Sequence, residues 1–364
     1  PERGVLLALE ALENYPYVYQ AERALGTAVQ SSRVRAILPQ SPSATNAVAW
    51  SDDGGRFVTV GEDNTAQIWD AATGQPQITL IGHTRELINV DWSPNGALIA
   101  TAGRDNAVRI WDAATGEPLR LFSGYPDWVL DVAWSPDGTR IATTSADGAV
   151  RVWELRTGDL LLDVLAQEQV YVNSVDWSPD GTWLVTAEQA GMVRVWDTAS
   201  GAQAFSWTAH TGNVAEAVWS PGGTHIATGS WDETVRVWDV REALAVSDSV
   251  RQEAPAVNLE YTITDHINNV TGVAWSRDGS LLLTSSRDLT ARVWDADNGA
   301  LLYTLGYVGT IFMLLMAVTI ILSMKNKRLA WVVVLYFLWD FLFYYNQVLF
   351  FNSSALIVLT IIFY

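Results

Sequence analysis

One short pattern recurs six times along the chain and constrains the fold more than any other feature. Each copy contains a tryptophan in a setting such as "NVDWSPNG" or "DVAWSPDG", and a second tryptophan follows 19 residues later. The first tryptophans are Trp50, Trp92, Trp134, Trp177, Trp219 and Trp275, and the second are Trp69, Trp111, Trp153, Trp196, Trp238 and Trp294. Successive copies are 42, 42, 43, 42 and 56 residues apart. This double spacing indicates an array of similar structural units.

The interior of each copy predicts β-structure. Short runs of β-branched and aromatic residues alternate with Asp-Gly and Ser-Pro turns, as in "RIATTSADGAVRVWE". This pattern is typical of four antiparallel strands joined by hairpins. Because such a sheet has two apolar faces, it needs a neighbouring sheet on each side, and radial packing of the sheets gives an all-β fold, the β-propeller.

The details of the repeat carry a family resemblance. The endings "VRVWD" and "VRIWD", the pair Gly82 and His83, and the 42-residue period resemble WD-repeat propellers over residues 41–305. In that family, a network of His, Ser or Thr, Asp and Trp braces a blade. The resemblance implies this brace in three repeats: His83, Thr101, Asp105 and Trp111 in the second; His210, Thr228, Asp232 and Trp238 in the fifth; His266, Thr284, Asp288 and Trp294 in the sixth. The first, third and fourth repeats lack the histidine, so we expect their blades to loosen more easily.

The number of blades depends on residues 33–40, "RVRAILPQ". Their apolar run resembles the fourth strand of a repeat, and WD-repeat rings commonly close by lending an N-terminal strand to the last blade. The sixth repeat already has its own fourth strand at residues 300–304. We therefore predict six detectable blades of a seven-bladed ring that lacks three strands. A six-bladed or open propeller with a membrane anchor is the alternative, although an open ring exposes unpaired strand edges.

The sequence before the propeller, residues 1–32, predicts a helical lead-in. Residues 4–14 and 20–32 have apolar positions at helical spacing. With the following strand they resemble the segment that leads into the propeller of bacterial STAND-type signalling NTPases. Helices that cap a propeller in any multidomain protein are the alternative interpretation.

The sequence after the propeller, residues 306–364, changes character. Residues 307–324 and 329–351 are two apolar spans around the basic loop "KNKR", which predicts a transmembrane helical hairpin. Asp340 in the second span is a candidate for a functional intramembrane group, or else a tolerated polar residue. Residues 1–305 contain arginine but no lysine, whereas the tail contains two lysines among three basic residues. This switch favours a foreign segment joined at Gly306 over a native anchor.

The net charge and the placement of reactive groups narrow the range of possible functions. Residues 1–305 carry 19 basic and 39 acidic side chains, a net charge of −20, which disfavours binding to nucleic acid or anionic lipid. The chain has no cysteine, and three of its four histidines fall at brace positions on different blades, so we predict no metal and no cofactor. Most carboxylates sit in turns, and no Ser-His-Asp or Glu pair recurs in a setting that would raise a pKa. We therefore predict that the protein is not an enzyme.

The best candidate site is the rim of one face of the propeller. Two positions in each repeat reach that rim, one before the first strand and one before the turn aspartate: Glu86, Trp128, Tyr171, Asn213 and Asn269, and Arg104, Trp231 and Arg287. Trp, Tyr and Arg dominate the energetics of protein interfaces, which favours a protein or peptide partner. The alternative is a solvated rim whose aromatic residues pack on neighbouring loops.

These observations predict a non-catalytic interaction scaffold or sensor in a prokaryotic signalling protein, with a cytoplasmic propeller by resemblance. The alternative is a membrane-anchored receptor or assembly factor held by residues 307–351.

Overall fold

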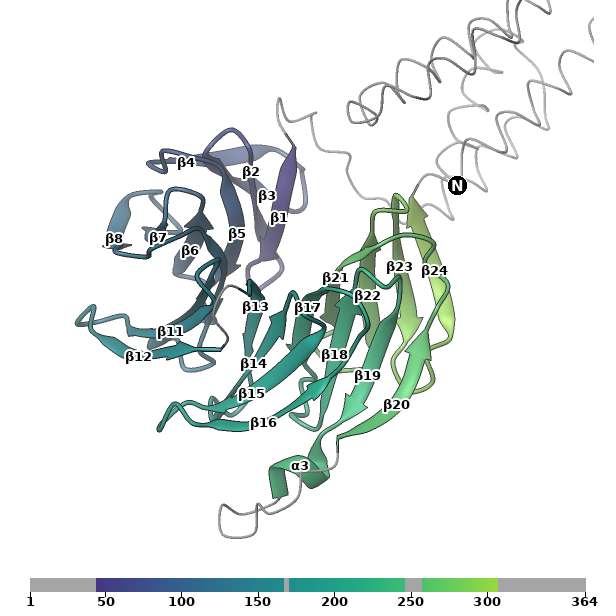
Figure 1. The fold of residues 1–364 in the computed structure, drawn as a ribbon. Helices are drawn as coiled ribbons and strands as arrows, with labels where there is room; N and C mark the ends of the chain where they lie inside the picture. The colour runs from purple at the N-terminus through teal and green to yellow at the C-terminus, as the bar shows by residue number, and fades with distance from the viewer. Residues whose placement is uncertain (1–43, 167–169, 246–256, 307–364) are drawn as a thin grey trace, which may run out of the picture. The chain divides into compact units, whose positions relative to one another are not determined.

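Six four-stranded antiparallel sheets form the part of the chain that the computed structural model describes, residues 44–166, 170–245 and 257–306 (Figure 1). In each sheet the strands lie side by side in chain order. The prediction of an all-β propeller with six detectable four-stranded blades is therefore confirmed.

The blades are numbered in chain order. Blade 1 consists of β1 (Thr45–Trp50), β2 (Arg56–Gly61), β3 (Thr65–Asp70) and β4 (Pro76–Ile81). Blade 2 consists of β5 (Leu87–Trp92), β6 (Leu98–Gly103), β7 (Ala107–Asp112) and β8 (Pro118–Phe122). Blade 3 consists of β9 (Val129–Trp134), β10 (Arg140–Ser145), β11 (Ala149–Glu154) and β12 (Leu160–Leu165).

The second half of the propeller follows the same plan. Blade 4 consists of β13 (Val172–Trp177), β14 (Trp183–Glu188), β15 (Met192–Asp197) and β16 (Gln203–Thr208). Blade 5 consists of β17 (Val214–Trp219), β18 (His225–Ser230), β19 (Val235–Asp239) and β20 (Asn258–Ile263). Blade 6 consists of β21 (Val270–Trp275), β22 (Leu281–Ser286), β23 (Thr290–Asp295) and β24 (Leu301–Gly306). The short helix α3 (Arg241–Ala245) follows β19 within the longer spacing before repeat six.

Packing between blades explains the recurring tryptophans. The first strand of each blade packs on the first strand of the next from β1 to β21, so these six strands are the inner strands. Each of five apolar clusters in the described residues joins two consecutive blades, and none joins blade 6 to blade 1. The tryptophan that ends each inner strand of blades 2 to 5 is buried in these clusters. A blade therefore has a leading face, against the preceding blade, and a trailing face, against the following one.

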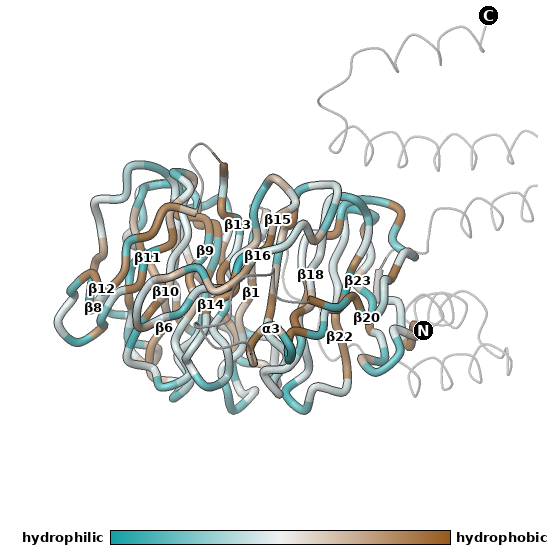
Figure 2. The backbone as a smooth tube through the Cα atoms, turned by 60° about the horizontal axis from the view of Figure 1, so that its bottom comes forward, coloured by the Kyte–Doolittle hydropathy of each residue, from teal (hydrophilic) through white to brown (hydrophobic). Residues whose placement is uncertain are grey.

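The four residues after each inner strand, Ser-Pro-Asp-Gly in blades 3 and 4 and a variant of it in the others, form a tight turn. In blade 3, the Ser135 hydroxyl donates to Asp137 at 2.6 Å, and the same carboxylate accepts the Thr139 N–H at 3.0 Å. Gly138 has a φ of 69°, a left-handed conformation that glycine adopts without steric cost. Figure 2 shows the result along the propeller, with apolar residues on the strands and hydrophilic residues at the loops of both ends.

Several predictions fall on residues outside those that the structure describes. They are the helices at 4–14 and 20–32, the additional strand in residues 33–40, Asp340 and the helical tail. The boundaries 1–32, 33–305 and 306–364 therefore stay predictions. Within the described ranges, no helix is long and apolar enough to cross a membrane.

Candidate functional site

The two rim positions that the sequence predicts in each repeat are paired through their backbones. In blade 2, the Arg104 N–H donates to the Glu86 carbonyl at 2.8 Å, and in blade 5 the Trp231 N–H donates to the Asn213 carbonyl at 2.9 Å. The equivalent N–H···O pairs are Ala146 to Trp128, Gln189 to Tyr171 and Arg287 to Asn269, at 2.8, 3.0 and 2.9 Å. The loop before each inner strand and the turn between the second and third strands therefore meet at the same end of the blade.

Side chains also connect the rim positions of adjacent blades. The Arg104 guanidinium of blade 2 lies 4.6 Å from the centre of the Trp128 ring of blade 3, and it pairs with Glu86 at 2.8 Å. The Arg287 guanidinium of blade 6 lies 5.1 Å from the centre of the Trp231 ring of blade 5. Such contacts stabilise exposed side chains by about 0.5–1 kcal/mol, so they hold the two indole rings in place.

Two rim aromatic residues remain open to solvent despite these contacts. Tyr171 of blade 4 is 41% exposed and Trp231 of blade 5 is 43% exposed. Between them, the Asn173 amide nitrogen donates to the Asn213 amide oxygen, which joins the rims of blades 4 and 5. Blades 3, 4 and 5 thus present three aromatic side chains in succession, with an arginine stacked at each end of the series.

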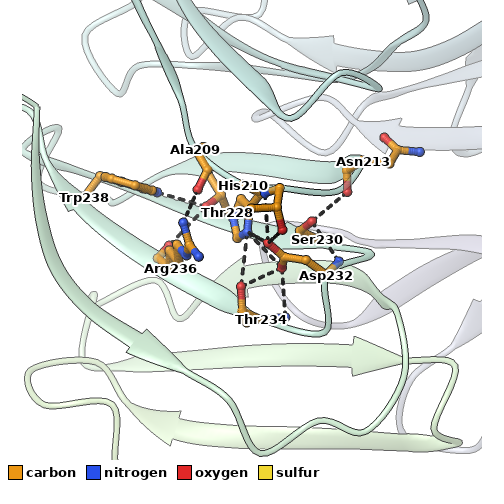
Figure 3. Close-up of polar contacts among 10 residues, drawn as sticks. Ala209, His210, Asn213, Thr228, Ser230, Asp232, Thr234, Arg236 and Trp238 are labelled. Atoms are coloured by element: carbon orange, nitrogen blue, oxygen red, sulfur yellow. Dashed lines mark hydrogen bonds and ion pairs between the residues drawn. The ribbon is translucent and has the colours of Figure 1, made fainter.

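The polar brace predicted for blade 5 forms a directed chain of hydrogen bonds (Figure 3). The Trp238 indole N–H donates to the Thr228 hydroxyl at 3.0 Å, and this hydroxyl lies 2.7 Å from His210 Nε2. His210 Nδ1 lies 3.0 Å from Asp232, whose carboxylate also accepts the Thr234 hydroxyl at 2.6 Å. All donors point the same way if His210 is neutral with its proton on Nδ1. Burial lowers the pKa of His210, which favours this neutral form.

Blades 2 and 6 have the same chain of hydrogen bonds. Its distances in blade 2 are 2.8 Å for His83–Asp105, 2.8 Å for His83–Thr101 and 2.8 Å for Trp111–Thr101. Its distances in blade 6 are 2.8 Å for His266–Asp288, 2.7 Å for His266–Thr284 and 2.9 Å for Trp294–Thr284. These residues are bound to one another inside the blades, so they are structural and leave the rim as the candidate site.

Blade 3 contains a substitute for the missing histidine that the sequence reasoning missed. The Tyr125 hydroxyl lies 3.0 Å from the Thr143 hydroxyl, and the Arg151 guanidinium stacks on the Tyr125 ring at 5.3 Å. Arg151 also pairs with Asp147 at 2.7 Å. Tyr125 stands 42 residues after His83, the spacing of the repeat itself, and this offset was the available signal.

Blades 1 and 4 keep only part of the brace. Trp69 donates to Thr59 at 2.9 Å, and Trp196 donates to Thr186 at 3.0 Å. In blade 4 an ion pair between the buried Glu188 and Arg194 lies at the end of the same strands. Blade 4, which lacks the histidine and the turn aspartate, therefore has an ion pair at the end of these strands instead of the histidine network.

The inner strands contain a second set of residues that the sequence reasoning missed. Asp131 Oδ1 accepts the N–H of Val132 in its own blade, and Oδ2 accepts the N–H of Val175 in the next blade, both at 2.8 Å. The inner strand is the edge of its sheet, so some of its N–H groups have no partner strand. Each carboxylate of this kind accepts such N–H groups. The other such contacts are Asp91 with Trp92 and Trp134, Asp176 with Trp177 and Trp219, and Glu216 with Val273.

These four carboxyl groups have raised pKa values, a setting that the sequence reasoning did not identify. Burial raises the pKa of Asp91 to about 6 and those of Asp176 and Glu216 to about 7. Burial and the nearby Glu216 raise the pKa of Asp131 well above its usual range. The cause is desolvation together with mutual repulsion. Because backbone N–H groups occupy their oxygens, these carboxyl groups act as structural connections between blades rather than as exposed acids or bases.

The described residues contain no group of three or more His, Asp or Glu side chains placed to hold a metal ion. The absence of a metal and of a cofactor therefore stays a prediction for the whole chain.

Six four-stranded blades and the His–Asp–Thr–Trp braces define a WD-repeat β-propeller. Residues 44–257 match the family described as IFT122 first beta-propeller, and residues 257–295 match the family described as WD domain, G-beta repeat. The chain belongs to this family of WD-repeat propellers. No curated protein gives a significant match. WD-repeat propellers generally mediate protein–protein interaction and are typically non-catalytic scaffolds.

Proposed function

We propose that this protein is a non-catalytic interaction scaffold whose rim, across blades 3 to 5, binds a protein or peptide. The observation that carries the proposal is the exposure of Tyr171 and Trp231 on adjacent blades, where neither strand needs an aromatic residue. Burying such side chains on a partner releases apolar surface from water, and aromatic residues dominate interface energetics for this reason.

The chemistry of the partner follows from charge. Residues 1–305 have a net charge of −20, so a basic or neutral segment is attracted and an acidic one is repelled. The stacked Arg104 and Arg287 flank the aromatic series and add local donors for backbone carbonyls of a bound chain. We propose a basic peptide segment with at least one large apolar side chain as the ligand.

The cellular setting is a separate part of the proposal. A sensor role in a prokaryotic signalling protein, with a cytoplasmic propeller, rests on the resemblance of the N-terminal residues alone, which lie outside the described ranges. The IFT122 family match adds no support for that setting. A membrane-anchored receptor rests on residues 307–351, which also lie outside those ranges.

The test is a selection of peptides that bind the purified full chain from a random library, followed by affinity measurements with variants. Trp231→Ala and Tyr171→Ala should each weaken the selected peptides at least about tenfold, which corresponds to a loss of about 1.4 kcal/mol. Leu161→Ala is the matched control, because Leu161 is also exposed but lies on the outer strand β12.

Thermal unfolding of each variant establishes that the fold is retained. Selected peptides that bind Trp231→Ala and Tyr171→Ala as tightly as the unchanged chain would contradict the rim assignment. A selection that yields no binder would contradict the scaffold function at this site.

A further inference from the structure

Blade 1 has a leading face that no other blade of the described residues covers. Val48 is 56% exposed, whereas the equivalent residues of blades 2 to 6 are at most 4% exposed. Trp50 is 58% exposed, whereas the equivalent tryptophans of blades 2 to 5 are 4–5% exposed. Within the part of the chain that the structure describes, no blade therefore lies against the side chains that form the apolar contacts at every other junction. Large exposed apolar side chains in a cluster indicate an interaction surface.

Blade 6 has the complementary defect on its trailing face. Leu283 is 45% exposed, whereas the residues at its position in blades 1 to 5, namely Val58, Ala100, Ala142, Val185 and Ala227, are fully buried. Val293 is partly exposed, whereas its equivalents are at most 1% exposed. No packing comparable to that of the other inner strands joins β21 to β1 in the described residues. We call the two uncovered faces, Val48 with Trp50 and Leu283 with Val293, the seam.

The backbone at the seam also lacks a polar contact that the other junctions have. In blades 4 and 5, the N–H groups of Val175 and Trp219 donate to carboxylates of the preceding blade, at 2.8 Å in each case. The equivalent N–H groups in blade 1 belong to Val48 and Trp50, and within the described ranges no side chain accepts them. An occupant of the seam with an Asp or Glu on its inner strand would satisfy one of them.

The turns at one end of the inner strands show how loosely the seam is closed. In blades 2 to 5 the proline of each turn lies beside the glycine of the next turn: Pro94 beside Gly138, Pro136 beside Gly181, Pro179 beside Gly223 and Pro221 beside Gly279. Blades 1 and 6 have Asp52 and Arg277 at the proline position, and these two side chains form an ion pair at 3.1 Å across the seam. Both are exposed, so the pair contributes little and opens easily.

We propose that the seam is a second docking surface, distinct from the rim, and that it takes one four-stranded β-blade of a partner protein. The chemistry of the occupant follows from the junctions within this chain, with which the seam is continuous. Its leading face carries valine and tryptophan against Leu283 of blade 6. Its trailing face carries a carboxylate on the inner strand that accepts one backbone N–H of blade 1, as each such carboxylate does at the junctions within this chain.

The test uses the absence of cysteine from the chain. Single variants of the full chain, Val48→Cys and Leu283→Cys, report on the two faces of the seam through the rate of thiol labelling. Leu161→Cys is the control, since Leu161 is similarly exposed but lies on the outer strand of blade 3. The probe is a synthetic peptide of residues 170–209, the sequence of the chain's own fourth blade, with an Asp176→Ala peptide beside it.

The expected result is that the peptide slows labelling at both seam cysteines at least about tenfold at ten times its Kd and leaves the control unchanged. The Asp176→Ala peptide should bind at least about tenfold more weakly, because it cannot accept the Trp50 N–H of blade 1 as Asp176 accepts the equivalent Trp219 N–H within the chain. Equal protection of all three cysteines, protection of one seam face only, or no protection would overturn the proposal. Slow labelling of Val48→Cys before peptide is added would also overturn it, because the face would then already be covered. Rim variants such as Trp231→Ala should not change any of these rates.

Discussion

The His210 side chain connects the Thr228 hydroxyl to the Asp232 carboxylate inside blade 5. Its removal takes one hydrogen bond from each of these groups and leaves Asp232 with the Thr234 hydroxyl and Thr228 with the Trp238 indole. Breaking a buried polar network from one side costs the desolvation of the groups that remain. We expect His210→Ala to lower the free energy of unfolding by about 2–4 kcal/mol, measured by urea denaturation.

His225 provides the control for this prediction, because it is the one histidine of the chain outside a brace. It pairs with Glu260 at 2.8 Å, but both side chains are partly exposed. Such a pair contributes under about 1 kcal/mol. If His225→Ala lowered the free energy of unfolding as much as His210→Ala, the directed hydrogen-bond chain would contribute no more to stability than an exposed ion pair.

At the residue scale, the sequence was most informative where the repeat keeps its residue type. The positions of His, Thr, Asp and Trp in repeats two, five and six follow from fixed offsets. Tyr125 occupies the histidine offset of blade 3 but belongs to a different chemistry, in which a hydroxyl and a stacked arginine replace the imidazole. Its role could not be predicted from the residue type, because it depends on Arg151 from another strand.

At the scale of elements, the carboxylates between inner strands predict how stability depends on pH. Burial raises the pKa of Asp176 to about 7 in the folded protein, from 3.8 in the unfolded chain. Between these values the folded state binds more protons than the unfolded state. The stability that Asp176 contributes is therefore fully present below pH 3.8 and is lost as the pH rises through about 7.

Asp176→Asn tests this dependence because asparagine resembles the protonated acid. We expect little change in the free energy of unfolding at pH 5 and a gain of about 1–3 kcal/mol at pH 8, measured by urea denaturation. Asp239 is a control, since its hydrogen bond with Arg241 holds its pKa at about 2 and it does not titrate in this window. A variant that is less stable than the unchanged chain at pH 8 would mean that the ionised carboxylate is required between blades 4 and 5.

The brace aspartates act in the opposite direction. Burial alone would raise the pKa of Asp288, but hydrogen bonds from Thr290 and His266 outweigh it and hold the pKa at about 2. The stability that Asp288 contributes is present above pH 3.8 and is lost as the pH falls towards 2. Together, the two sets of carboxylates place the pH of maximum stability between about 3.8 and about 7.

The sequence shows the strands of each blade but not the junctions between inner strands. The alternation of apolar residues and the turn residues determine the four strands of each repeat from neighbours in sequence. Asp91, Asp131 and Asp176 instead accept N–H groups 43 or 44 residues away, in the next blade. An acid one or three residues before the first tryptophan is the sequence signal, and it has meaning only once adjacent blades are known to pack through their inner strands.

At the scale of the whole molecule, the structure and the sequence make different predictions about which blades loosen first. From the missing histidines, we expect blades 1, 3 and 4 to loosen first, because their polar braces are incomplete. From the uncovered faces, we expect blades 1 and 6 to loosen first, because each has one face without a neighbour in the described residues. In a repeat protein, the stability of a unit depends strongly on its interfaces with neighbouring units.

Blades 5 and 6 separate these two causes, because both contain the full His–Asp–Thr–Trp brace but only blade 6 borders the seam. Burying a large apolar side chain stabilises by about 1.5–3 kcal/mol, and Leu283 lacks that burial. We therefore expect amide hydrogens of β22 and β23 to exchange at least about tenfold faster than those of β18 and β19, measured by native-state hydrogen exchange. Faster exchange in blades 3 and 4 than in blade 6 would show instead that the polar brace, rather than the packing between blades, determines the order in which this propeller opens.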